Sequence, residues 1–252
     1  TGNDGYTLYI SDDDGATWDA GTDVAANIVT KTFDTLSDNT AYVFKAVTKR
    51  VAEPTTSADS NELDALTLIS APTLTLGTVT DDSITVEWTN ITGNAGYTVY
   101  ISDDDGATWD EGTAVLTNVT SLLFDTLDMN TAYVFKATTQ RATAPTDSAD
   151  SAELDGLTLI SAPINFAASN PTSSQITLSW TNVVGNDGYR VYKSLDGNTW
   201  EALVADNVAD DVNVDVTGLT AETLYHFVVR TKRVAAPEFS ADSLEITEST
   251  TA

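Results

Sequence analysis

The sequence predicts an all-β protein made of antiparallel β-sandwiches in tandem. Strand-like segments recur at a fixed distance along the chain. Hydrophobic and polar residues alternate within these segments, which is typical of strands with one buried face. Turn-forming residues separate the segments at intervals of about 8–12 positions, with no helical periodicity.

The repeat is 91 residues long. Tyr9–Asp19 and Tyr100–Asp110 both read YISDDDGATWD, and NTAYVFKA and LTLISAP recur at the same 91-residue distance. A third, more diverged copy keeps GNDGY at Gly185–Tyr189 and SADS at Ser240–Ser243. A period this long indicates whole small domains rather than the short units of a solenoid. We predict three domains, at residues 1–70, 71–161 and 162–252.

The second copy contains the complete set of predicted strands. In the second of them Ile84, Val86 and Trp88 alternate with polar residues, which places the three on one buried face. Turn residues such as Asp81, Gly93 and Asp128 separate the strands. The predicted strands, in order, are Thr73–Thr78, Ser83–Trp88, Tyr97–Ser102, Ser121–Phe124, Tyr133–Thr139 and one within Ser148–Leu159.

These residues resemble the fibronectin type III family, whose domains are immunoglobulin-like sandwiches. Trp88 and Trp180 end the second strand, and Gly-Tyr-x-Val-Tyr occurs in the third. A leucine also precedes a tyrosine by six positions in each copy, and the resemblance assigns these tyrosines, Tyr42, Tyr133 and Tyr225, to a tyrosine corner. The likeness is to tandem domains of prokaryotic extracellular surface or adhesin-like repeat proteins.

The first copy is expected to be an incomplete sandwich. Its opening residues align with the middle of the second copy, so it lacks counterparts of the first two strands and of Trp88. A sandwich without two strands has an open core and an unpaired edge. Either the chain belongs to a longer array, or another chain donates the two strands.

Charge and composition exclude several classes of function. The formal charge is −27, from 11 Lys and Arg against 38 Asp and Glu. Nucleic acids and anionic membranes are therefore excluded as partners, and a saline source is expected. The chain has no cysteine, which favours a prokaryotic source, and no apolar run long enough to span a membrane.

One motif with the pattern S-x-D-x-G-x-T-W resembles the Asp-box, a β-hairpin found in sialidases and unrelated β proteins. The resemblance implies a structural turn between the third and fourth strands of the sandwich rather than catalysis. A form shortened by one residue occurs at Ser194–Trp200. The predicted hairpin residues are Ser11, Asp13, Gly15, Thr17, Trp18, Ser102, Asp104, Gly106, Thr108 and Trp109.

Calcium is the one cofactor with candidate ligands. Asp103, Asp105 and Asp128 are expected at the same end of the second domain, facing the third domain. The spacing does not match an EF-hand, so a site would have to be assembled from several loops. The alternative interpretation is that these are solvated acidic loops without a metal.

The junctions between domains are predicted to be stiff and electrostatically matched. Basic residues at Lys49–Arg50, Arg141 and Lys232–Arg233 lie at the end that meets the preceding domain. We expect Asp12–Asp14 and Asp38 to face Arg141, and Asp103–Asp105 and Asp128 to face Lys232 and Arg233. The connector LISAP contains proline and no flexible Gly/Ser run.

No catalytic group is predicted. The single histidine, His226, is expected on the outer surface of a strand. Tyr9, Tyr100 and Tyr192 also face outward, where they either pack across strands or stack on sugars. Asn90 and Asn118 match the pattern for N-glycosylation.

The predicted function is structural and non-enzymatic: a stiff acidic stalk, adhesin spacer or filament body on the cell surface. Its partners are neighbouring repeats or other copies of the protein. One alternative is a set of glycan-binding or spacer domains in a secreted polysaccharide-active enzyme. Another is a subunit of an extracellular fibre whose chains exchange strands.

Overall fold

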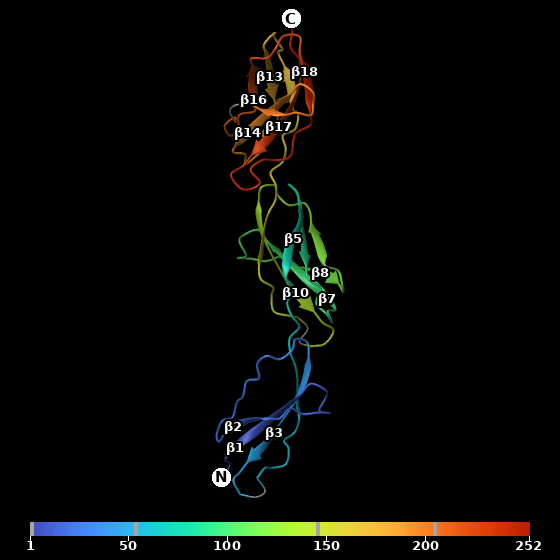
Figure 1. Cartoon of the computed structure of the whole chain (residues 1–252), viewed down its shortest axis with the longest axis vertical. Coiled ribbons are helices and arrows are strands. Elements are labelled where there is room, and N and C mark those ends of the chain that lie inside the picture. The colour runs from blue at the N-terminus through green and yellow to red at the C-terminus, as the bar shows by residue number, and fades with distance from the viewer. Residues whose placement is uncertain (1–2, 53–54, 145–146, 204–205) are drawn as a thin grey trace.

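The computed structural model describes residues 3–52, 55–144, 147–203 and 206–252. These residues form 18 β-strands and no helix, which confirms the all-β prediction. The strands form three groups that lie end to end, with the N-terminus at one end of the molecule and the C-terminus at the other (Figure 1). We call the groups the first, second and third domains and keep the predicted boundaries as names.

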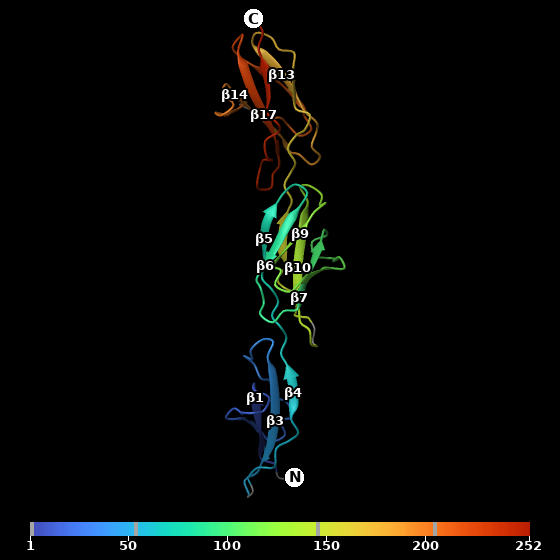
Figure 2. The ribbon, with the colours of Figure 1, turned by 90° about the vertical axis from the view of Figure 1, so that its right-hand side faces the viewer.

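The second domain is a sandwich of two antiparallel sheets. One sheet has the order β5-β6-β9 and the other the order β11-β10-β7-β8. The turned view shows β5 and β6 to the left of β7 and β10 (Figure 2). The strands are β5 (Leu74–Val79), β6 (Ile84–Trp88), β7 (Gly96–Ser102), β8 (Thr113–Leu116), β9 (Ser121–Phe124), β10 (Ala132–Gln140) and β11 (Leu154–Leu157).

The third domain repeats this topology. Its sheets have the orders β12-β13-β16 and β15-β14-β17-β18. The strands are β12 (Ala167–Ser169), β13 (Gln175–Ser179), β14 (Gly188–Ser194), β15 (Glu201–Ala202), β16 (Asn213–Thr217), β17 (Leu224–Lys232) and β18 (Ile246–Ser249).

Each complete domain has one core between its two sheets. In the second domain the Trp88 and Tyr97 rings meet edge to face at 5.5 Å, and in the third Trp180 and Tyr189 do so at 5.2 Å. Edge-to-face geometry brings the positive ring edge to the negative ring face. The alternating residues predicted to point inward, such as Ile84 and Val86, are fully buried.

The first domain has a single sheet within the described residues. It has the order β2-β1-β3-β4, from β1 (Gly5–Ser11), β2 (Thr22–Ala25), β3 (Ala41–Lys49) and β4 (Leu63–Leu66). Tyr6 and Leu8 are only half-buried, whereas their counterparts Tyr97 and Val99 are fully buried. The structure thus agrees with the prediction of an incomplete first sandwich.

The missing sheet also changes the segment 30–33. Its counterpart in the second domain is β9, which is held by backbone pairing to β6. The first domain has no counterpart of β6 among its described residues, and 30–33 is not a strand there. Phe33 instead packs on Phe44, with ring centroids 5.0 Å apart. Strand formation here depends on the pairing partner rather than on local propensity.

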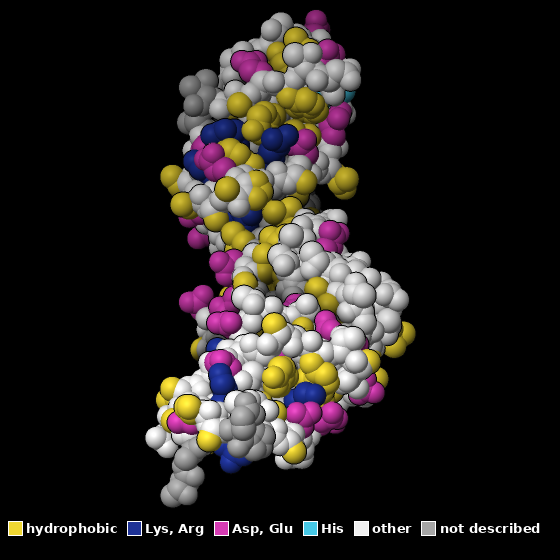
Figure 3. Space-filling model, turned by 60° about the horizontal axis from the view of Figure 1, so that its bottom comes forward, with side chains coloured by type: hydrophobic (Ala, Val, Ile, Leu, Met, Phe, Trp, Pro, Cys, Tyr) yellow, Lys and Arg dark blue, Asp and Glu magenta, His cyan; other side chains and the backbone are white. Residues whose placement is uncertain are grey.

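Acidic side chains are spread over the surface that Figure 3 shows, with smaller groups of Lys and Arg among them. Ion pairs within a single domain include Lys49–Asp23 and Arg230–Asp242. No helix of the described residues is able to cross a membrane.

Candidate functional site

The repeated S-x-D-x-G-x-T-W motif forms a hydrogen-bonded turn after β1 and again after β7. The Ser11 hydroxyl donates to the Asp13 carboxylate at 2.7 Å, and the Gly15 amide donates to Ser11 Oγ at 3.0 Å. Thr17 donates both its amide and its hydroxyl to Asp13, at 2.8 and 2.6 Å. The same bonds join Ser102, Asp104, Gly106 and Thr108 in the second domain. Each aspartate therefore holds the turn closed.

These bonds stabilise the ionised form of the aspartates. Hydrogen bonds from the side chain and backbone of Thr17 lower the pKa of Asp13 to about 2. The corresponding bonds from Thr108 also lower the pKa of Asp104. The carboxylates are consequently ionised acceptors and do not supply a proton for catalysis near neutral pH.

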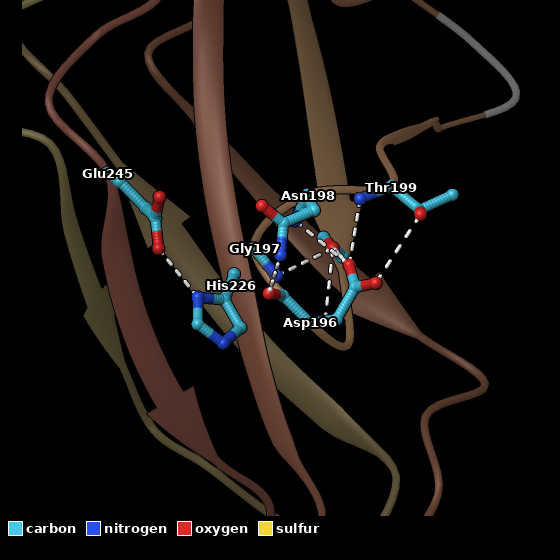
Figure 4. Close-up of polar contacts among 7 residues, drawn as sticks. Asp196, Gly197, Asn198, Thr199, His226 and Glu245 are labelled. Carbon is cyan, nitrogen blue, oxygen red and sulfur yellow. Dashed lines mark hydrogen bonds and ion pairs between the residues drawn. The ribbon is translucent and has the colours of Figure 1, made fainter.

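The third domain keeps this turn in its shorter form. Asp196 accepts the amides of Asn198 and Thr199 at 2.9 and 2.8 Å, and these bonds lower its pKa to about 2 (Figure 4). His226 of β17 lies beside the turn and faces Glu245, with its Nδ1 2.6 Å from the Glu245 carboxylate. His226 thus has a carboxylate partner at the surface.

A lysine lies between two aromatic rings beside each of the first two turns. Lys136 Nζ lies 4.4 Å from the Trp109 ring centroid and 5.5 Å from the Tyr100 ring centroid, and 2.8 Å from Asp150 Oδ2. Lys45 makes the same contacts with Trp18, Tyr9 and Asp59. A cation–π contact with a lysine of β3 or β10 therefore joins the tryptophan that ends each motif to the sheet.

The outward tyrosines belong to these clusters. Tyr9 and Tyr100 each have a lysine over the ring, and the Arg230 guanidinium lies 4.8 Å from the Tyr192 ring centroid. All three tyrosines are half-buried. Their ring faces are engaged with neighbouring strands, which favours the packing interpretation over sugar stacking.

The calcium candidates do not form a metal cluster. Among the described residues, no three His, Cys, Asp or Glu side chains lie close enough to hold a metal ion. Asp103 and Asp105 line a groove together with Asp155. The backbone of Asp128 takes part in the bonds of the tyrosine corner.

The tyrosine-corner residues make the same bond in all three domains. The hydroxyl oxygens of Tyr42, Tyr133 and Tyr225 accept the backbone amides of Ser37, Asp128 and Thr220, at 3.0, 3.0 and 2.9 Å. Each bond closes the turn just before β3, β10 and β17. That turn lies at the end of the domain that meets its successor in the chain.

The first junction contains a buried arginine. Arg141 belongs to the second domain and is 5% exposed. Its Nη1 donates to Asn39 Oδ1 at 2.9 Å and to the backbone carbonyl of Thr67 at 2.7 Å, both in the first domain. Gly93 packs against the same asparagine, and a Cβ at this position would come within 2.7 Å of Asn39 Nδ2. Gly93 also has a φ of +80°, a backbone conformation that favours glycine.

The second junction repeats this contact. Arg233 of the third domain is 1% exposed. Its Nη1 donates to Asn130 Oδ1 at 3.1 Å and to the Thr158 carbonyl at 2.7 Å. Its other nitrogens donate to the carbonyls of Pro237 and Ala236 within its own domain. Burial lowers the pKa of Arg233 from its ordinary value.

The predicted ion pairs at this junction are wrong. Lys232 pairs with Asp206 and Glu238 of its own domain rather than with Asp103–Asp105 or Asp128. Arg233 binds neutral oxygens of the second domain instead of carboxylates. Carbonyl oxygens suit a buried arginine because they satisfy its N–H groups without burying a second charge.

Sequence reasoning missed the acceptors of these arginines. Asn39 and Asn130 have positive φ angles of 48° and 52°, and Thr67 and Thr158 follow them in the chain. All four lie inside segments that recur 91 residues apart. The repetition is visible in the sequence, but it does not reveal that the asparagine accepts a hydrogen bond from an arginine. Tolerance of a positive φ explains an asparagine in a turn equally well.

Apolar residues close the junctions as well. Ile69 and Ile160 of the two connectors are each 2% exposed. Met129 of the second domain packs against the core of the third, and the Ser161 hydroxyl donates to Asp81 at 2.6 Å. Leu68, beside Ile69 in the first connector, is half exposed.

Comparison with known proteins identifies the domains. A family profile described as "Fibronectin type III domain" matches residues 161–244, which is nearly the whole third domain. Its fold repeats in the second domain and, as one sheet, in the first. Residues 161–244 are thus a fibronectin type III domain, and the second domain has the same fold.

A solved structure of two fibronectin type III domains has the same fold. A two-domain segment from chicken tenascin aligns over 72% of this chain and 100% of its own length, with 18% identity and a TM-score of 0.50. Domains FN1–FN3 of chicken CNTN1 align over 100% of this chain and 90% of their own, with 16% identity and a TM-score of 0.34, which adds nothing to the fold assignment.

One curated relative is an enzyme. Chitinase A1 of Niallia circulans is 32% identical over 180 residues, which are 69% of this chain and 24% of the chitinase. The chain therefore spans about a quarter of the length of that relative. The 180 aligned residues exceed the length of one 91-residue repeat.

Proposed function

We propose that these domains form a stiff, non-catalytic, acidic spacer within an extracellular surface protein. The observation that carries this proposal is the arginine contact, which occurs with equivalent partners at both junctions. A buried arginine that bonds two acceptors on the neighbouring domain fixes the orientation of the two domains more firmly than a surface ion pair does.

The connectors support stiffness. Each runs directly from the last strand of one domain into the next and buries its isoleucine. In the second junction Thr231 Oγ1 also donates to the Ser161 carbonyl at 2.7 Å, which ties the connector to β17. A strand of about ten residues is roughly 35 Å long, so three domains in line extend on the order of 100 Å.

The charge of −27 suits an exposed spacer. Like charges along a rod repel other copies and resist collapse, which keeps an extended molecule soluble. The partners proposed for this role are neighbouring repeats of the same polypeptide, and the proposed location is the cell surface.

A second candidate function follows from the similarity to Chitinase A1. In it, the domains belong to a polysaccharide-active enzyme and separate its other parts or contact glycans. Glycan binding that is lost in Tyr100→Ala and Tyr192→Ala would favour this role. Binding that is absent in the unaltered chain would favour the spacer role.

Stiffness is testable by pulsed electron–electron double resonance. The chain has no cysteine, so spin labels attach only to cysteines that are introduced. Spin labels at Leu123→Cys and Thr217→Cys would report the distance between β9 and β16, on exposed strand positions of neighbouring domains. The spacer role predicts one narrow distance distribution. A broad distribution would contradict it.

A further inference from the structure

The end of each domain that faces its successor carries a socket for an arginine. We define the socket as the backbone carbonyl of a threonine together with the side chain of the positive-φ residue that precedes β3 or β10. The two sockets are Thr67 with Asn39 and Thr158 with Asn130. Arg141 fills the first socket and Arg233 fills the second. The third domain has a counterpart of this socket, formed by Thr250 and Glu222.

The backbone of the third socket is already in the arginine-binding arrangement. Thr250 Oγ1 donates to the Thr220 carbonyl at 2.6 Å, as Thr158 Oγ1 donates to Asp128 at 2.7 Å. The Thr223 amide donates to Thr250 Oγ1 at 3.0 Å, as the Thr131 amide donates to Thr158 at 2.9 Å. The frame that presents the carbonyl is therefore the same in both domains.

Glu222 takes the place of the asparagine. Its φ of 54° matches the 48° of Asn39 and the 52° of Asn130. Its amide donates to the Thr251 carbonyl, as the Asn130 amide donates to Leu159. A glutamate is costly at positive φ compared with asparagine, so its presence points to a use for the carboxylate. A carboxylate binds an arginine more strongly than an amide oxygen does.

The opposite end of the molecule carries the matching arginine. Arg50 precedes Arg141 by 91 positions and is exposed. Its amide donates to the Thr55 carbonyl at 2.9 Å, as the Arg233 amide donates to Glu238 at 2.8 Å. The backbone amides of Arg50 and Arg233 thus make equivalent hydrogen bonds, each to the carbonyl five residues later.

We propose that the third socket binds Arg50 of a second copy of this chain, so that molecules associate end to end. Arg50 would donate to the Glu222 carboxylate and the Thr250 carbonyl in the way that Arg233 donates to Asn130 and Thr158. The Glu222 carboxylate supplies a charge attraction to arginine that the neutral asparagines of the other two sockets do not supply. This association goes beyond the spacer role, which requires no contact between chains.

Charge reversal in the 252-residue chain tests the proposal. NMR of the ¹⁵N-labelled chain would follow the backbone amides of Thr223 and Thr251, which lie beside the third socket. The protein concentration would be raised to about 1 mM. A contact made by one arginine is small compared with the about 1,200–2,000 Å² of a stable interface, so the association is expected to be weak. The unaltered chain should show concentration-dependent shifts at these amides. Arg50→Glu and Glu222→Arg alone should each abolish them.

The decisive sample is a mixture of labelled Glu222→Arg with unlabelled Arg50→Glu. The shifts should return, because the reversed charges attract, and the mean charge of the mixture equals that of the unaltered chain. Asp215→Arg, which makes the same charge change on β16, should leave association intact. Circular dichroism would verify that every variant is folded.

Two outcomes would overturn the proposal. In the first, the concentration-dependent shifts of the Thr223 and Thr251 amides persist in either single variant. In the second, the mixture shows no such shifts although each variant is folded. Neither outcome bears on the stiffness of a single chain. The distance measurement between β9 and β16 in dilute solution therefore fails or succeeds independently.

Discussion

Arg233 donates a hydrogen bond of 3.1 Å to Asn130, a residue 103 positions earlier in the chain and in the preceding domain. The same nitrogen donates to the Thr158 carbonyl at 2.7 Å. Arg141 is bonded to Asn39 and Thr67 in the same way. One buried arginine at each junction therefore bonds the two neighbouring domains in an equivalent way.

Replacing Arg233 by alanine should loosen the second junction. It leaves the Thr158 carbonyl without this donor, and an unsatisfied buried polar group costs about 1–3 kcal/mol. The distance distribution between labels on β9 and β16 should broaden. Arg230→Ala, which removes an arginine that pairs with Asp242 inside the third domain, is the matched control and should leave the distribution narrow. Equal broadening in both variants would contradict the assignment.

Tyr133→Phe should destabilise the second domain. The change removes the acceptor of the Asp128 amide and keeps the ring, so the expected loss in free energy of unfolding is about 0.5–1.5 kcal/mol. Denaturant unfolding followed by circular dichroism measures it. Tyr100→Phe, on the outer face of β7, should change stability by less. A neutral Tyr133→Phe would show that the corner bond contributes little.

The hairpin aspartates should titrate in strong acid. Their pKa is depressed in the folded chain, so their contribution to stability is fully present above the ordinary value of 3.8 and is lost as the pH falls through about 2. Carbon-detected NMR of the carboxyl groups measures this, and Asp13→Asn and Asp196→Asn assign the signals. Midpoints near 3.8 for both residues would show that the turns are open in solution.

Lys136 and Trp109 should be energetically coupled. A double-mutant cycle with Lys136→Met and Trp109→Leu should give about 0.5–1 kcal/mol of interaction free energy, the range of exposed cation–π pairs. Denaturant unfolding of the four variants measures it. A second double-mutant cycle, between Lys136 and Trp200 of the third domain, is the control, and the effects of its two substitutions on the free energy of unfolding should be additive. Additive effects at Lys136 and Trp109 would mean that the contact is incidental.

Much of the fold could be predicted because each strand carries its own pattern. Ile84, Val86 and Trp88 alternate with polar residues, and the structure buries all three. β8 was missed because Thr113–Leu116 shows no clear alternation and is mostly exposed. Its pairing is set by the neighbouring β7, which no local pattern reveals.

The junctions could be predicted only in outline. The sequence places basic residues at the correct end of each domain, but it suggests carboxylates as their partners because acidic residues are so abundant. The actual acceptors are an asparagine and a backbone carbonyl. A backbone acceptor leaves no signature in side-chain composition, so only the three-dimensional arrangement identifies it.

The equivalence of the two arginine contacts has a geometric consequence. If one set of contacts places every domain on its predecessor, each step along the rod is the same rotation combined with the same advance. Repetition of a single such step generates a screw. The acidic hairpins that follow β1, β7 and β14 then lie along a helical path of constant pitch, and a longer run of identical repeats would display them at regular angular intervals around its axis.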